Sequence, residues 1–249
     1  MYKKLFIPGP VNVTEDTLQK MATPMIGHRG KEASTLQRGI SDKLRKLMYT
    51  QNEILLSTSS GSGLMEGAVR SCTQKRAAVF SCGNFGNRWF AMAEDNNIPA
   101  DKFEVEWGLP NTAESVDQVL ATGKYDLITI THNETSSGVM NPVEEIAKVM
   151  KKYPEVIFCV DAVSSLGGTK IEVDKLGIDI CITSSQKCLG LPPVFLYAQS
   201  QKKPWRQPGK LSLEELTMIC YKFMNILKRK IINTPLLLLC LICLPLIIN

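Results

Sequence analysis

The sequence predicts an α/β domain built on a mostly parallel sheet with helices on both faces. The first observation is a pair of apolar, β-branched runs at residues 156–161 and 178–183, which are typical of strands buried on both faces. The second is that polar residues follow where each run ends, Asp161 in the first case and Lys187 in the second. The third is a repeated alternation of strand and helix patterns, which indicates parallel strands joined by crossover helices.

Composition suits one globular domain, or one domain with a fragment of another. The chain has 249 residues, 44% of them hydrophobic and 21% charged, so a sizeable core is expected and extensive disorder is not. Residues 194–249 hold eight Lys and Arg against two Asp and Glu; of the totals of 29 and 24, this leaves 21 and 22 for residues 1–193. Because the net charge of +5 comes from the tail, no nucleic-acid partner is expected.

The eight cysteines favour a cytoplasmic chain without disulfide bonds. Several lie inside expected strands, where a reduced thiol packs as a small hydrophobe. Cys240 and Cys243 form a lone CxxC in an apolar run without a second ligand pair, so no metal site is expected. The apolar stretch near the N-terminus is too short for a signal peptide, and export is not expected.

Two helices are expected after an extended N-terminal segment. Residues 5–11 contain two prolines and a glycine, which hold the backbone outside the helical region. Thr14 is suited to cap a short helix over residues 14–21. Residues 32–49 predict an amphipathic helix, with an apolar stripe formed by Leu36, Ile40, Leu44 and Leu47.

A strand at residues 53–57 leads into a turn rich in serine and glycine at residues 59–63, followed by a helix. Such a turn presents free backbone N–H groups and the positive end of the helix dipole, which together bind phosphate. Many strand-to-helix turns have the same composition for conformational reasons alone. The turn is not a Walker loop, because no Gly-Lys-Ser/Thr follows it.

The middle of the chain continues the alternation. Strands are expected at residues 77–81, 102–107 and 126–131, and helices at 115–121 and 142–152. The first of these strands delivers Cys-Gly-Asn-Phe-Gly-Asn-Arg-Trp at residues 82–89, and the third delivers His-Asn-Glu-Thr-Ser-Ser-Gly-Val at residues 132–139. An isolated histidine such as His132 usually has a structural role.

Asp161 and Lys187 are expected to face one ligand, because ligands of such sheets bind beyond the carboxyl ends of the strands. A lysine beside a carboxylate suits pyridoxal phosphate: the lysine forms a Schiff base, and the carboxylate keeps the ring nitrogen protonated. These two residues alone also fit a capping aspartate and a solvated lysine.

Four motifs together resemble the class V aminotransferases, in particular the alanine–glyoxylate and serine–pyruvate aminotransferases. They are Pro-Gly-Pro at residues 8–10, the octet at 132–139, Asp-Ala-Val-Ser-Ser-Leu-Gly-Gly at 161–168, and Ser-Ser-Gln-Lys at 184–187. The resemblance covers residues 4–193 and implies the large domain of a fold-type I pyridoxal phosphate enzyme.

The resemblance also implies a set of site residues. Lys187 corresponds to the Schiff-base lysine and proton shuttle, and Asp161 to the partner of the pyridinium nitrogen. Phe85 and Val163 correspond to the residues that enclose the cofactor ring. The remaining contacts are expected from Ser62, Gly63, Leu64, Thr135 and Gln186. Leu64 can offer only its backbone N–H, so one side-chain contact found in many members is missing.

The implied activity is transfer of an amino group from alanine or serine to glyoxylate or pyruvate by a cytoplasmic homodimer. Two other readings stay open. One is another class V reaction of the lyase or desulfurase type, although no convincing catalytic cysteine is present on a later loop. The other is a non-catalytic fragment that binds the cofactor.

The resemblance breaks after Pro193, where Val194 replaces the family's glycine. Residues 194–249 are therefore expected to be an aberrant tail in place of the family's small C-terminal domain, and the activity of the chain to be impaired. The apolar run at 235–248 is shorter than the roughly 20 residues of a spanning helix and contains Pro245, so a membrane tether is the lesser alternative.

A frameshift near codon 194 would explain the tail. Codons compatible with residues 202–207, read one base earlier, give Glu-Lys-Ala-Met-Glu-Ala, and residues 236–239 treated in the same way give Thr-Thr-Pro-Pro. Both strings resemble the family at corresponding places and in the same order. Degenerate codons make such matches easy to find, so the nucleotide sequence across codons 190–200 is the decisive observation.

Overall fold

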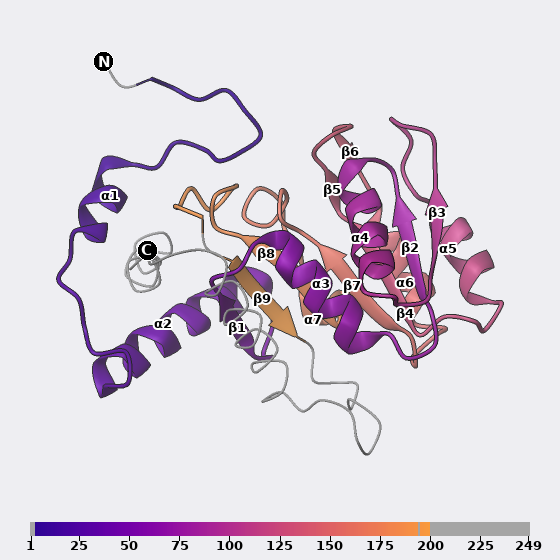
Figure 1. Ribbon diagram of the computed structural model, residues 1–249, viewed down its shortest axis with the longest axis horizontal. Helices are drawn as coiled ribbons and strands as arrows, with labels where there is room; N and C mark the ends of the chain where they lie inside the picture. Colours follow the sequence, from indigo (N-terminus) through magenta and orange to yellow (C-terminus); the bar gives the residue numbers. More distant parts are fainter. Residues whose placement is uncertain (1–2, 194, 200–249) are drawn as a thin grey trace.

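The computed structural model describes residues 3–193 and 195–199, and within them seven strands form one central sheet. The strands are β1 (Ile54–Ser57), β2 (Ala77–Ser81), β3 (Ala100–Glu104), β4 (Leu127–Thr131), β7 (Ile157–Asp161), β8 (Ile180–Ser184) and β9 (Phe195–Gln199). Their order across the sheet is β1-β9-β8-β7-β4-β2-β3 (Figure 1). Every pair from β8 to β3 is parallel, whereas β9 is antiparallel to both β1 and β8. The mostly parallel sheet is confirmed.

Helices cover both faces of the sheet, as expected. They are α2 (Lys31–Met48), α3 (Gly61–Cys72), α4 (Asn84–Asp95), α5 (Ala113–Leu120) and α6 (Val143–Met150). On one face of the sheet, α3 and α4 form a hydrophobic core with every second residue of the strands. On the other face, α2, α5 and α6 form a second core with the strand residues in between. In Figure 1, α3 and α4 cross in front of the sheet. On β2, Val79 belongs to the core of α3 and α4 and Phe80 to the opposite core.

The N-terminal helices follow the sequence pattern closely. Ile40 and Leu44 of α2 are buried, and Leu36 and Leu47 pack against the same core, so the amphipathic stripe is confirmed. A short helix, α1 (Glu15–Met21), precedes α2. Thr14 occupies the N-cap position of α1, but its hydroxyl pairs with the hydroxyl of Thr17 at 3.0 Å and does not cap a backbone N–H.

Several elements differ from the sequence expectation. Strand β3 begins and ends earlier than the expected 102–107, because its backbone pairs in register with β2, from Ala77 opposite Ala100 to Ser81 opposite Glu104. A small hairpin of β5 (Asn133–Glu134) and β6 (Val139–Met140) and a short helix, α7 (Val173–Leu176), were not expected. Two-residue strands and single-turn helices are too short to produce a periodic pattern in the sequence.

The domain boundary expected at residue 193 falls directly before β9, so the sheet continues to Gln199. Val194 and residues 200–249 lie outside the described residues, together with the apolar run at 235–248 and the tether suggested for it. Within the described part of the chain, no helix has the length and apolar character needed to cross a bilayer.

Candidate active site

The carboxyl ends of β7 and β8 bring Asp161 and Lys187 together. The two strands are parallel neighbours, with Asp161 opposite Ile182, and Lys187 follows β8 in the next loop. The charge of each side chain affects the pKa of the other, as expected for groups that face one space. The structure therefore places these two residues at the same edge of the sheet.

Asp161 is a buried carboxylate, only 2% exposed, at the last position of β7. Burial raises its pKa from 3.8 to about 6. The backbone N–H of Val163, which donates to Oδ1 at 2.9 Å, opposes this shift. The charge of Glu134 raises the pKa further, and Trp89 and Lys187 lower it. Among the described residues, the Trp89 indole Nε1 has no partner at hydrogen-bond geometry, and its N–H dipole stabilises the Asp161 carboxylate electrostatically.

The N-terminal segment packs directly on Lys187. The amine Nζ donates to the carbonyl of Pro8 at 3.2 Å, and the N–H of Val11 donates to the carbonyl of Gln186 at 3.0 Å. Gly9 has a φ of +148°, and a Cβ at this position would lie 2.6 Å from Cδ of Lys187, so only glycine fits. Partial burial lowers the pKa of Lys187, and the charges of Asp161 and Cys188 raise it.

The glycine-rich turn forms the N-terminus of α3, as the sequence indicates. Ser60 is the N-cap, and its hydroxyl accepts a hydrogen bond from the N–H of Gly63 at 3.1 Å. The N–H of Leu64 donates to the carbonyl of Ser60 at 3.1 Å, and the Leu64 side chain is buried. Of the expected phosphate contacts, the N–H groups of Gly63 and Leu64 are thus already paired with Ser60, and Ser62 is partly exposed.

Phe85 and Val163 pack against the same core, which is formed with α3 and α4. The guanidinium of Arg88 lies 5.0 Å from the centre of the Phe85 ring, and its Nη1 donates to the hydroxyl of Ser62 at 3.2 Å. Arg88 thus links the first turn of α4 to the first turn of α3. The sequence alone gave no indication of this contact.

Thr135 and Gln186, two more of the expected residues, follow strands and differ in their hydrogen bonding. The hydroxyl of Thr135 forms a hydrogen bond with the hydroxyl of Ser164. The side-chain oxygen of Gln186 is buried and has no partner among the described residues. His132 is a structural histidine: its Nδ1 lies 3.0 Å from the Ser165 hydroxyl, and burial lowers its pKa.

Glu134 and Trp89 are near the site but were not expected to contribute to it. Glu134 is fully buried and accepts a hydrogen bond from the N–H of Phe85, and Trp89 is a buried residue of α4 that lowers the pKa of Asp161. The one available signal for Glu134 was an acidic residue inside an otherwise neutral octet after a buried strand. Within the described residues, no group of three histidine, cysteine or acidic side chains is placed to hold a metal ion.

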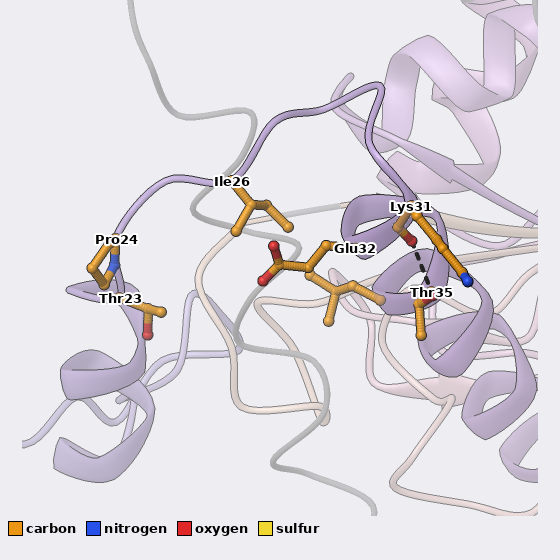
Figure 2. A pocket seen from close by; sticks show the side chains of 7 residues that line it. Thr23, Pro24, Ile26, Lys31, Glu32 and Thr35 are labelled. Atoms are coloured by element: carbon orange, nitrogen blue, oxygen red, sulfur yellow. Dashed lines mark hydrogen bonds between the residues drawn. The ribbon is translucent and has the colours of Figure 1, made fainter.

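A pocket of about 600 Å³ lies elsewhere, where the end of α1 meets the start of α2. Figure 2 shows Thr23 and Pro24 on one side of it and Glu32 and Thr35 on the other, with Ile26 between them. None of the residues that line it is an expected site residue. The candidate site is therefore identified by the positions of Asp161 and Lys187 and not by this pocket.

Comparison with known proteins is consistent with this geometry. A family model described as aminotransferase class-V matches residues 13–211, which extends past residue 193. An uncharacterized aminotransferase of Methanocaldococcus jannaschii is 41% identical over 208 residues, covering 82% of this chain and 53% of that protein. The L-aspartate–glyoxylate aminotransferase of Paracoccus denitrificans is 30% identical over 197 residues, covering 76% of this chain and 50% of that protein.

The fold also matches solved structures. The crystal structure of alanine–glyoxylate aminotransferase from Nostoc sp. superposes with a TM-score of 0.82 at 25% sequence identity, covering 96% of this chain and 64% of that one. The chain spans about half the length of the curated relatives that it matches.

Proposed function

This chain belongs to the class V aminotransferases, which are pyridoxal phosphate enzymes, and from that premise we propose that it transfers an amino group from a small amino acid to a 2-oxo acid. We propose alanine or serine as the donor and glyoxylate or pyruvate as the acceptor. Relatives named as glyoxylate aminotransferases support the class of acceptor.

The observation that carries the proposal is the placement of Asp161 at the end of β7 and of Lys187 just after the end of its parallel neighbour β8. One strand end supplies a buried carboxylate and the other a partly buried amine whose pKa burial lowers. A lysine in such a setting spends more time as the neutral amine that reacts with a carbonyl group. The arrangement therefore supports a Schiff-base enzyme better than a solvated surface lysine.

The residues present fit pyridoxal phosphate. Burial destabilises the negative charge of the Asp161 carboxylate, and a cationic N–H group beside it would stabilise that charge. The carboxylate therefore suits a protonated pyridine nitrogen. The unpartnered side-chain oxygen of Gln186 can accept a hydrogen bond from a ligand group. The first turn of α3 offers the Ser62 hydroxyl and the positive end of the helix dipole to a phosphate.

When bound, the cofactor supplies an electron-accepting ring conjugated to the amino nitrogen of the substrate. Each residue then has a distinct task. Asp161 would pair with the positive charge on the ring nitrogen, and Phe85 and Val163 would exclude water from the ring. Thr135 and Gln186 orient the ring by hydrogen bonds. Lys187 would move the substrate's Cα proton through its Nζ, and the Pro8 carbonyl accepts a hydrogen bond from that amine in the structure.

Cofactor labelling tests this assignment directly. The 249-residue chain is incubated with pyridoxal phosphate, reduced with borohydride and mapped by peptide mass spectrometry. We expect the label on Lys187, and we expect Lys187→Met to abolish it. The exposed Lys175 provides the matched control, because Lys175→Met should leave labelling unchanged. Label on another lysine with Lys187 free would contradict the assignment.

A second measurement separates the enzyme from a fragment that only binds the cofactor. Unreduced protein incubated with pyridoxal phosphate is supplied with alanine and glyoxylate, or with serine and pyruvate, and the new amino acid, glycine or alanine, is quantified. Labelling without amino transfer would favour the non-catalytic reading.

We further propose that the family form is a cytoplasmic homodimer and that residues 194–249 are a frameshifted remnant of its C-terminal region. The match of the family model to residue 211 means that the point of departure must be located at the nucleotide level. Sequencing across codons 190–200 locates it, and restoring the frame should yield a longer chain with measurable amino transfer. A nucleotide sequence whose shifted frame encodes no family-like continuation after codon 194 would contradict the frameshift.

A further inference from the structure

Glu134 is a fully buried carboxylate that joins two segments far apart in the sequence. Its Oε2 accepts hydrogen bonds from the N–H groups of Phe85 at 2.9 Å and Gly86 at 3.1 Å. Its Oε1 accepts from the N–H of Ser136 at 3.1 Å and from the Ser136 hydroxyl at 2.6 Å. Four donors therefore satisfy both oxygens without a cationic side chain.

The contact with Phe85 is made at the start of α4. The first N–H groups of a helix lack partners inside the helix, and a carboxylate there also interacts favourably with the helix dipole. The Ser136 hydroxyl accepts the N–H of Asn84 at 2.9 Å, so Glu134 and Ser136 together bind three successive N–H groups of α4. The direction of the first turn is thereby fixed relative to β5.

Gly83 shows how closely the two segments approach. A Cβ at Gly83 would lie 2.5 Å from the Ser136 hydroxyl oxygen and 2.6 Å from Cγ of Glu134. The backbone before α4 therefore rests directly on the carboxylate side chain. An arrangement this close leaves little freedom for Phe85, the second residue of the helix.

We propose that Glu134 is a positioning residue for the cofactor ring: its carboxylate holds the first turn of α4 so that the Phe85 side chain keeps one orientation at the site. This inference rests on the proposed function, in which Phe85 packs on that ring. Glu134 does not itself touch the ring, and it acts through the backbone of residues 85 and 86. Its negative charge also raises the pKa of Asp161, which is consistent with a place next to the site.

The first test measures backbone exchange in the full 249-residue chain without added cofactor. Glu134→Gln keeps the shape of the side chain but places an NH₂ group against backbone or hydroxyl donors. We expect the amides of Phe85 and Gly86 to exchange roughly 10- to 100-fold faster, as loss of hydrogen bonds to a charged acceptor would give. The amides of β4 and β7 should be unchanged, and Glu145→Gln, at an exposed glutamate of α6, should change neither set.

The second test asks whether the effect on the cofactor passes through Phe85. We expect Glu134→Gln to raise the dissociation constant for pyridoxal phosphate by roughly tenfold, and to have little further effect in a Phe85→Ala background. A steric or purely structural loss would weaken binding equally in both backgrounds. Equal weakening, or unchanged exchange at Phe85 and Gly86, would overturn the proposal, and so would uniformly faster exchange throughout the sheet.

A milder variant covers the case in which Glu134→Gln does not fold. Ser136→Ala removes one donor to Oε1 and the acceptor for Asn84, and we expect faster exchange at residues 84–86 with the sheet unchanged. Unchanged exchange at residues 84–86 would overturn the proposal. If the unmodified chain binds no pyridoxal phosphate, the proposed function fails, and the exchange results then decide separately whether Glu134 holds this turn.

Discussion

Asp161 shows at the scale of one residue how the fold prepares a charge for a ligand. The sheet and α4 exclude water from the carboxylate, and the N–H of Val163 donates a hydrogen bond to it. Burial raises its pKa to about 6, so the folded chain without a ligand binds this proton more tightly than the unfolded chain. The site is therefore destabilised at neutral pH unless a positive group approaches Asp161.

The pH dependence of stability checks this account. A carboxyl whose folded pKa is raised stabilises the fold most below its unfolded pKa of 3.8, and this contribution falls as the pH rises through about 6. A shift of this size corresponds to roughly 3 kcal/mol. In cofactor-free protein, we expect the unfolding free energy of the natural chain, relative to Asp161→Asn, to fall by an amount of that order between about pH 4 and about pH 7.

Urea unfolding at several pH values gives the measurement. The Asn variant serves as the reference because its side chain does not titrate and the other groups remain. A difference between the two proteins that stays constant with pH would mean that Asp161 is solvated or already paired.

At the scale of elements, the N-terminus of α3 combines a structural and a proposed binding role. Ser60 caps α3 through the N–H of Gly63, and Thr112 caps α5 in the same way through the N–H of Ser115 at 3.2 Å. Both caps satisfy a backbone donor that the helix itself cannot satisfy. Only α3 begins beside Arg88 and Phe85.

Removing each cap distinguishes these roles. We expect Ser60→Ala and Thr112→Ala each to lower the unfolding free energy by about 1 kcal/mol. Only Ser60→Ala should also raise the dissociation constant for pyridoxal phosphate, because it loosens the turn that carries Ser62. Fluorescence titration with the cofactor checks the second effect, and equal binding by both variants would remove the turn from the phosphate site.

The N-terminal segment offers a second prediction at this scale. Gly9→Ala places a methyl group against the Lys187 side chain, so we expect the segment to move and the hydrogen bond from Nζ to Pro8 to be lost. The Lys187 amine should then react roughly tenfold faster with an acylating reagent, because loss of one hydrogen bond to a charged group changes the rate by about this factor. Mass spectrometry of the acylated peptide follows the rate.

Gly39→Ala is the matched control for that substitution. Gly39 lies inside α2 with no other atom within 4 Å of the added Cβ, so alanine should stabilise the chain by about 0.5–1 kcal/mol and leave Lys187 unchanged. An unaltered Lys187 rate in Gly9→Ala would show that the segment does not shield the amine.

At the scale of the whole molecule, β9 completes the sheet. It pairs antiparallel with β1 on one side and with β8 on the other, so it joins the first strand of the chain to the strand that precedes Lys187. Without β9, both neighbours would present unpaired backbone groups. The stability of the loop that carries Lys187 thus depends on residues beyond position 193.

Truncation tests this dependence. We expect a chain ending at residue 199 to unfold cooperatively, and a chain ending at residue 194 to melt at least about 10 °C lower or not to fold. Thermal unfolding followed by circular dichroism compares them. Identical melting would show that β9 is dispensable and that the folded domain ends at residue 193.

Local sequence patterns, which depend on residues close together in the chain, predicted most of the helices and strands and the strand ends of the candidate site. The apolar runs that end at Asp161 and before Lys187 predicted β7 and β8, and the spacing of Ile40 and Leu44 predicted the buried face of α2. The need for glycine at position 9 could not be predicted, because it comes from close contact with the side chain of Lys187, 178 positions away. The short hairpin β5–β6 gave no periodic signal of its own.

The sequence by itself determined the α/β class, the strand ends that carry Asp161 and Lys187, and the glycine-rich helix start, because periodicity and composition act over a few residues. Only the tertiary structure decided which distant groups meet: Glu134 with the N–H of Phe85, 49 positions away, and Lys187 with the carbonyl of Pro8, 179 positions away. Such contacts follow from strand pairing and from burial that satisfies polar groups across the whole chain, and these are settled only when all segments pack together.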